Sequence, residues 1–146
     1  MCFFLIILFQ SLDDATALDF VLKEDIVCWI ETSKQVIRCS EINPAKKGKV
    51  KKVNKSKFFS DLIAESSLNV FFLSFQNTIV DTGLLRPEGL ACDWINRMIY
   101  WTDSETKRIE VASLSLDPKT GERFRKVLVW VDLDMPRSIA LAPKEG

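Results

Sequence analysis

The sequence predicts an all-β chain made of the four-stranded blades of a β-propeller. Between residues 86 and 112, short apolar runs are separated by turn residues with no helical period between them, which favours an antiparallel meander. The segment that begins at Pro87 has a second copy at Pro136, 49 positions later. A repeat of about 40 to 50 residues is typical of propeller blades.

A weaker copy of the same unit lies upstream. Trp29 precedes Trp101 by 72 positions, and Asp19 precedes Asp93 by 74 positions. Because the two spacings agree within two positions, we expect both pairs to be equivalent positions of successive blades. The excess over a single repeat length indicates insertions.

The clearest unit is centred on a strand at residues 98–103, which ends in the letters YWTD at 100–103. This motif resembles the signature of low-density lipoprotein receptor class B repeats. The resemblance implies part of a six-bladed YWTD β-propeller of an extracellular receptor. Since six blades need about 250 residues, it implies two blades and the start of a third in this chain.

The flanking segments resemble one branch of that family more closely, namely the low-density lipoprotein receptor-related proteins that act as Wnt co-receptors (types 5 and 6). The segments that support this resemblance are 83–85, 87–94, 100–106, 108–111, 125–128, 133–134 and 136–141. The resemblance implies a first blade at 12–53, a second at 80–132 and the start of a third at 133–146.

Residues 54–79 have no expected place in a blade. They include an apolar, β-prone stretch at 70–75 that would favour aggregation if it were exposed. We favour the hypothesis that an error in the gene model introduced them, and the alternative is an added strand or loop that packs on the propeller. A smaller surface insertion is expected at 115–122, which is rich in turn residues.

Residues 1–11 predict either a secretory signal or a mis-called start. The apolar run at 1–9 is too short to span a bilayer, and Ala-Thr-Ala at 15–17 has the pattern of a cleavage site, but no Lys or Arg precedes the run. Asn54 begins a glycosylation sequon. It lies in a lysine-rich run, 46–57, that we interpret as a solvated loop rather than a heparin or membrane patch.

The composition argues against several classes of function. Lys and Arg total 20, as do Asp and Glu, so no net field favours nucleic acid. Histidine is absent, and the sequence contains no nucleophile elbow and no phosphate-cradling glycine loop. We therefore expect no enzymatic activity, no cofactor and no metal, and we interpret Asp93, Asp103 and Glu105 as turn residues rather than a carboxylate cluster.

The four cysteines, Cys2, Cys28, Cys39 and Cys92, show no CxxC spacing, which argues against a zinc site. If a hairpin is centred on residues 33–34, Cys28 faces Cys39 across it. A disulfide between them is then one expectation for an oxidising compartment. Two buried thiols that behave as small hydrophobes are the other.

By resemblance, one face of the first propeller binds Wnt ligands and secreted antagonists with an Asn-x-Ile-type loop, such as Dickkopf and sclerostin. The ligand-binding residues that this implies here are Asp13, Asp14, Thr32, Ser33, Leu85, Glu88, Glu105 and Arg137. The implied structural residues of the repeat are Asp19, Trp29, Pro87, Gly89, Asp93, Tyr100, Trp101, Thr102, Asp103 and Pro136.

The chain departs from the family at several of these positions. The family's face is acidic, whereas this chain has Lys34, Gln35 and Arg86 there, which weakens the attraction of a basic ligand. Glu31 stands where the signature has Asp. That change leaves open whether an Asp-specific turn or inter-blade hydrogen bond forms in the first blade.

The resemblance thus predicts a fragment of a cell-surface receptor ectodomain that acts in Wnt signalling. The expected partners are Wnt-type ligands, their secreted antagonists and, in the full complex, a Frizzled-type receptor. The full receptor would lie at the plasma membrane through a transmembrane helix outside these residues, and the fragment itself would be secreted. The alternatives are a metal-dependent lactone hydrolase of the six-bladed propeller type and a truncated product without function.

Overall fold

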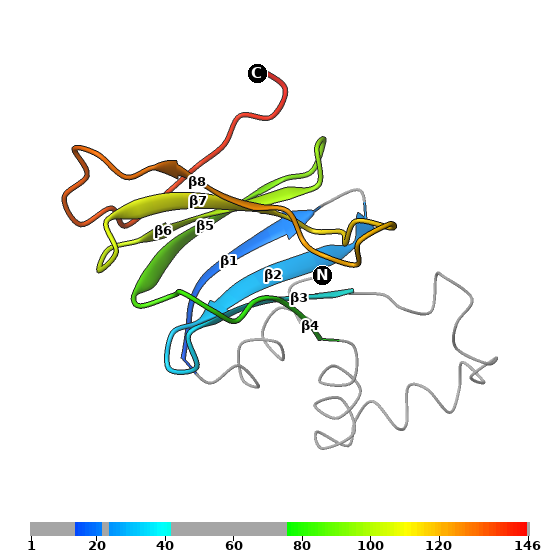
Figure 1. Ribbon diagram of the computed structural model, residues 1–146, viewed down its shortest axis with the longest axis horizontal. Helices are drawn as coiled ribbons and strands as arrows, with labels where there is room; N and C mark the ends of the chain where they lie inside the picture. The colour runs from blue at the N-terminus through cyan, green and yellow to red at the C-terminus, as the bar shows by residue number, and fades with distance from the viewer. Residues whose placement is uncertain (1–13, 22–23, 42–75, 146) are drawn as a thin grey trace, which may run out of the picture.

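The computed structural model describes residues 14–21, 24–41 and 76–145, and the regular elements in these ranges are all strands (Figure 1). The strands are β1 (Ala15–Val21), β2 (Ile26–Glu31), β3 (Val36–Glu41), β4 (Asn77–Val80), β5 (Pro87–Asp93), β6 (Met98–Asp103), β7 (Arg108–Ser113) and β8 (Arg125–Val129).

The strands form two sheets, each of which is an antiparallel meander in sequence order. The first sheet has the order β1-β2-β3-β4 and the second β5-β6-β7-β8. The expected all-β fold is therefore confirmed, and so is β8 as the fourth strand of the second blade. Figure 1 shows the two sheets stacked, with β1 against β5 where they meet.

Strand pairing aligns the two blades with a constant offset of 72 residues. Leu18 pairs with Trp29 in the first sheet, and Leu90 pairs with Trp101 in the second. The β2–β3 and β6–β7 hairpins keep the same offset. The spacing of the two tryptophans is thus the true spacing of the blades.

The expected equivalence of Asp19 and Asp93 is wrong. Asp19 pairs with Cys28, so the offset places it at the position of Ala91. Asp93 pairs with Met98 at the end of the β5–β6 hairpin. Spacing between residues of the same type pointed to Asp93, whereas the hydrogen-bond register defines equivalence.

The first blade is completed by a strand that the sequence placed in the insertion. The first three residues of β4 fall in the expected insertion at 54–79, and the fourth, Val80, falls in the expected second blade at 80–132. The strand nevertheless pairs with β3. Ile79 and Val80 are buried in the core, which explains why this short strand is held in the first sheet. Residues 1–13 and 42–75, with the expected signal, lysine run and sequon, lie outside the described residues.

The main core lies between the sheets. It combines Ile30 and Ile37 of the first sheet with Leu90, Ile99 and Trp101 of the second. Trp29 instead belongs to a smaller cluster with Val27, packed by Leu18 and Phe20. The two tryptophans lie on equivalent faces of their own sheets, and the sheets stack in one direction. Only Trp101, in the second sheet, therefore faces the core between the two sheets.

The expected first strand of a third blade is not formed, since residues 133–145 contain no strand. This segment nevertheless packs on the second sheet. The Thr102 hydroxyl donates to the Arg137 carbonyl at 2.8 Å and accepts from the Gly89 N–H at 2.9 Å. A strand needs a hydrogen-bonded neighbour, and none of the described strands pairs with this segment.

Candidate functional site

Four connecting segments gather at one end of the two sheets, where β2, β4, β6 and β8 end. We call them the loop face, which comprises Asp14 and residues 32–35, 84–88, 103–107 and 134–137. The side chain of Gln35 donates to the Leu85 carbonyl at 3.1 Å and so joins the first two segments. Lys107 and Asp134 form an ion pair at 3.1 Å that joins the last two.

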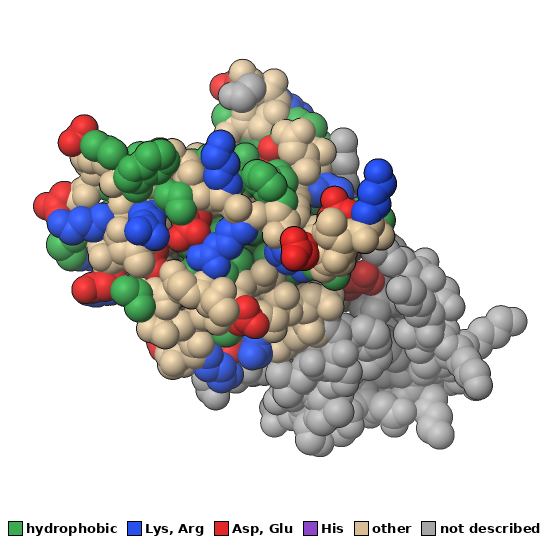
Figure 2. Space-filling view, viewed as in Figure 1, with side chains coloured by type: hydrophobic (Ala, Val, Ile, Leu, Met, Phe, Trp, Pro, Cys, Tyr) green, Lys and Arg blue, Asp and Glu red, His purple; other side chains and the backbone are tan. Residues whose placement is uncertain are grey.

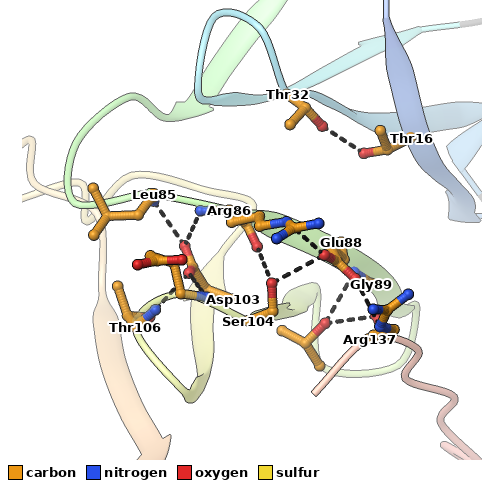
Figure 3. Close-up of polar contacts among 12 residues, drawn as sticks. Thr16, Thr32, Leu85, Arg86, Glu88, Gly89, Asp103, Ser104, Thr106 and Arg137 are labelled. Atoms are coloured by element: carbon orange, nitrogen blue, oxygen red, sulfur yellow. Dashed lines mark hydrogen bonds and ion pairs between the residues drawn. The ribbon is translucent and has the colours of Figure 1, made fainter. Parts of the chain in front are cut away.

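Asp103, the last residue of the YWTD motif, organises the second blade's part of this face. One of its carboxylate oxygens accepts from the N–H groups of Leu85 and Arg86 at 2.8 and 3.1 Å. The other accepts from those of Glu105 and Thr106 at 3.1 and 2.9 Å (Figure 3). Asp103 is fully buried, so this carboxylate holds two loops together and is not available to a ligand.

Glu31 occupies the same register position in the first blade but has different partners. Its Oε1 accepts from the Trp29 indole N–H and from Arg38, both at 3.1 Å. Its Oε2 lies 2.7 Å from the Lys34 ammonium. Burial acts to raise the pKa of Glu31, but hydrogen bonds from Lys34 and Trp29 and the charges of Arg38 and Lys34 lower it overall.

Asp93 and Asp19 have separate structural roles. Asp93 accepts from the backbone N–H groups of Ile95 and Asn96 and so closes its own turn. Burial acts to raise the pKa of Asp93, but the Asn96 side chain and these two N–H groups lower it overall. Asp19 accepts from the Cys92 N–H at 2.6 Å and thereby links β1 to β5.

Glu88 lies at the centre of the loop face. Its Oε1 is 3.0 Å from the Arg86 Nε and accepts a hydrogen bond from the Ser104 hydroxyl at 3.0 Å. Its Oε2 is 3.7 Å from the Arg137 Nε. Figure 3 shows the carboxylate between the two guanidinium groups. The expected acidic residue is therefore already paired with two cations.

The structure brings most of the implied ligand-binding residues to one end of the molecule, on the loop face. The described ones are Asp14, Thr32, Ser33, Leu85, Glu88, Glu105 and Arg137, whereas Asp13 lies outside the described residues. Sequence reasoning did not include Thr16, whose hydroxyl is 2.8 Å from that of Thr32, or Ser104. The position of Ser104 directly after the YWTD motif was the available signal.

Positive and negative side chains alternate over the surface of this protein, and Figure 2 shows Lys and Arg interspersed with Asp and Glu on the face drawn.

Of the implied structural residues, those that are buried are Trp29, Pro87, Gly89, Asp93, Trp101, Thr102 and Asp103. Burial fits a role in packing and turn closure rather than in ligand contact.

The first blade contains a disulfide between Cys28 and Cys39, which face each other across the β2–β3 hairpin. The structure therefore has the disulfide, and not the two free thiols of the alternative expectation. Cys92 is a buried free cysteine, and burial followed by the charge of Asp19 raises the pKa of its thiol to about 12. A thiol with so high a pKa is protonated and unreactive.

Within the described ranges, no three His, Cys, Asp or Glu side chains are grouped so that they could hold a metal ion. The same ranges contain no helix with the length and apolar character needed to cross a membrane.

Comparison with known proteins matches the chain to one family model and to two receptor-related proteins. Residues 97–141 match the low-density lipoprotein receptor repeat class B. The chain is 37% identical over 137 residues to low-density lipoprotein receptor-related protein 5 of Mus musculus, with 94% of the chain covered. It is 37% identical over 140 residues to the Homo sapiens protein of that name, with 96% covered. The chain spans 6% and 7% of the lengths of these relatives.

Among solved structures, the chain resembles one described as the crystal structure of a nidogen/laminin complex. The TM-score is 0.62 at 26% identity, with 90% of this chain and 37% of that chain covered. This likeness agrees with the two propeller blades described above.

Proposed function

We propose, from the chain's membership of the low-density lipoprotein receptor class B repeat family, that it forms part of a cell-surface receptor ectodomain that binds protein ligands. Its similarity to low-density lipoprotein receptor-related protein 5 supports this proposal. The Cys28–Cys39 disulfide also supports it, because such bonds persist outside the reducing cytosol.

In finer detail, the proposed ligands are Wnt-type proteins and their secreted antagonists, such as Dickkopf or sclerostin, with a Frizzled-type receptor in the full complex. The proposed location is the extracellular side of the plasma membrane. No observation favours the lactone hydrolase, and the relatives are named as low-density lipoprotein receptor-related proteins.

The observation that best supports ligand binding is the presentation of Leu85 on the loop face. Its backbone is held by Asp103 and by Gln35, yet 54% of the residue is exposed. A rigidly held, exposed apolar side chain surrounded by charged groups is the kind of feature that dominates binding energy at protein interfaces.

The test is binding of a purified antagonist, Dickkopf or sclerostin, to the immobilised full chain. Leu85→Asp is expected to weaken binding at least about tenfold, because a charge would replace the apolar contact. Leu116→Asp is the matched control, since Leu116 is 55% exposed in the β7–β8 loop at the opposite end of the sheets. Absence of binding, or equal losses in the two variants, would refute the proposal.

A further inference from the structure

We propose that Arg86 determines partner specificity on the loop face, so that this face accepts a protein loop bearing a carboxylate in preference to one bearing a basic side chain. The inference rests on the proposed function, because it assumes that a protein loop docks at this face. It concerns the charge of that loop, which the proposed function leaves undetermined.

The first support is the order in which an approaching partner meets the charges. The Glu88 side chain is 20% exposed, whereas those of Arg86 and Arg137 are 53% and 65% exposed. Both arginines contact the carboxylate, and Ser104 holds it from a third side. A partner therefore reaches two outward guanidinium groups before it reaches one recessed carboxylate.

The neighbouring turn shows the same arrangement. Lys34 is paired with Glu31 at 2.7 Å, and the lysine side chain is 51% exposed while the glutamate side chain is 3% exposed. The exposed carboxylates of the loop face are those of Asp14, Glu105 and Asp134, and Asp134 is paired with Lys107. In the two ion-paired clusters next to Leu85, the most exposed charges are thus the cations Lys34, Arg86 and Arg137.

Chemistry then favours an acidic partner group. Two guanidinium groups around one carboxylate leave an excess positive charge, and the planar guanidinium fork is well suited to receive a second carboxylate. A lysine from a partner could reach Glu88 only by displacing Arg86, and it would meet Arg137 at close range. Such like-charge contact is how interfaces reject a wrong partner.

The test uses the full chain and two cyclic peptides of equal length that differ only in carrying Glu or Lys beside a central Ile. The Ile is included because Leu85 offers an adjacent apolar surface. At physiological salt, the Glu peptide is expected to bind about three- to tenfold more tightly, a modest ratio because surface ion pairs are weak. The ratio should grow at low salt.

Variants connect this preference to the residues. Arg86→Ser should reduce the Glu-to-Lys ratio to about one, whereas Glu88→Gln should increase it, because the two guanidinium groups then lose their internal partner. Lys119→Ser is the control, since it removes an exposed cation from the β7–β8 loop at the opposite end. Circular dichroism would check that each variant keeps its strands.

Three results would overturn the inference: preference for the Lys peptide, a Glu preference that survives Arg86→Ser, or no binding of either peptide. The proposed function is judged separately by the purified antagonist. If the antagonist binds through Leu85 while the Glu peptide is not preferred, only the charge inference fails. If the Glu preference holds but no antagonist binds, the proposed function fails.

Discussion

The two blades share a backbone frame but close their equivalent turns with different side chains. In both, the first turn residue donates its N–H to the residue that precedes the first strand: Thr32 to the Asp14 carbonyl at 3.3 Å and Ser104 to the Arg86 carbonyl at 3.0 Å. The residue just before the turn, at the end of the second strand, differs between the blades, however. Asp103 accepts from four backbone N–H groups, whereas Glu31 accepts from three side chains.

This difference shows how one methylene group changes the connectivity of a loop face. The short aspartate reaches both the turn and the incoming linker, so it fixes the backbone that presents Leu85 and Arg86. The longer glutamate extends past the turn to cations, one of which is the half-exposed Lys34. Contacts to exposed cations are weakened by salt, whereas buried hydrogen bonds to the backbone are not.

The largest effect is expected at Asp103. Asp103→Ala should lower the free energy of unfolding by about 3 kcal/mol or more, because four N–H groups lose their acceptor. Glu31→Ala should cost about 1–2 kcal/mol. The half-exposed Lys34 can turn toward water and Arg38 keeps its bond to Gln76, so the main loss is the hydrogen bond from the buried Trp29 indole. Urea unfolding of the full chain, followed by tryptophan fluorescence, measures both. Equal losses would contradict the comparison. The loss in Asp103→Asn should fall between those of Asp103→Ala and Glu31→Ala.

The next effect concerns the disulfide, which is confined to the first blade. The equivalent pair in the second blade is Tyr100 and Val111, which packs without a covalent bond. Cys28 and Cys39 are 11 residues apart, so their cross-link should contribute about 2–3 kcal/mol by restricting the unfolded chain. Thermal unfolding with and without reductant measures this, with the Cys28→Ser/Cys39→Ser double variant as control. If reductant also lowers the melting temperature of that variant, the effect does not come from this bond.

A smaller effect is expected at Gly89, whose equivalent in the first blade is Ala17. A Cβ on Gly89 would overlap the carbonyl oxygen of Arg137 and lie 2.8 Å from the Thr102 hydroxyl. Gly89→Ala should therefore cost about 1–3 kcal/mol and speed amide exchange in residues 137–142. Ala17→Gly is the matched change, expected to cost about 0.5–1 kcal/mol through chain entropy. Unchanged exchange in Gly89→Ala would show that the segment does not pack there.

The smallest effect is expected from acid. The pKa values of Glu31 and Asp93 are lowered in the folded chain. A lowered pKa means that the stabilisation is complete above the unfolded-state values, about 4, and is lost as pH falls through the folded-state values. Stability should thus decline below about pH 4, and less steeply in Glu31→Gln and Asp93→Asn than in the exposed control Glu122→Gln. Parallel curves for all three variants would rule out these two carboxylates as the cause.

Local patterns predicted much of this molecule. The YWTD strand, its turn and the facing cysteines of the first hairpin follow from alternation and turn residues within a few positions. The short strand β4 was expected only under the alternative of an added strand in residues 54–79. Its four residues come one position after the apolar stretch at 70–75, and only its pairing with β3 identifies it. The mistaken equivalence of Asp19 and Asp93 has the same origin, since register depends on hydrogen bonds that residue spacing does not contain.

The sequence by itself determined the fold class, the blade spacing seen in the two tryptophans, and the residues that would gather on the loop face. Tertiary structure decided how those residues are paired. Glu88 meets Arg137 across 49 positions, and Asp19 meets the Cys92 N–H across 73. Local preferences act over a few residues, whereas the partners of a charged side chain depend on which distant segments packing brings within about 4 Å. For that reason the charge seen by a partner on the loop face follows from the fold, and not from the count of acidic residues in its loops.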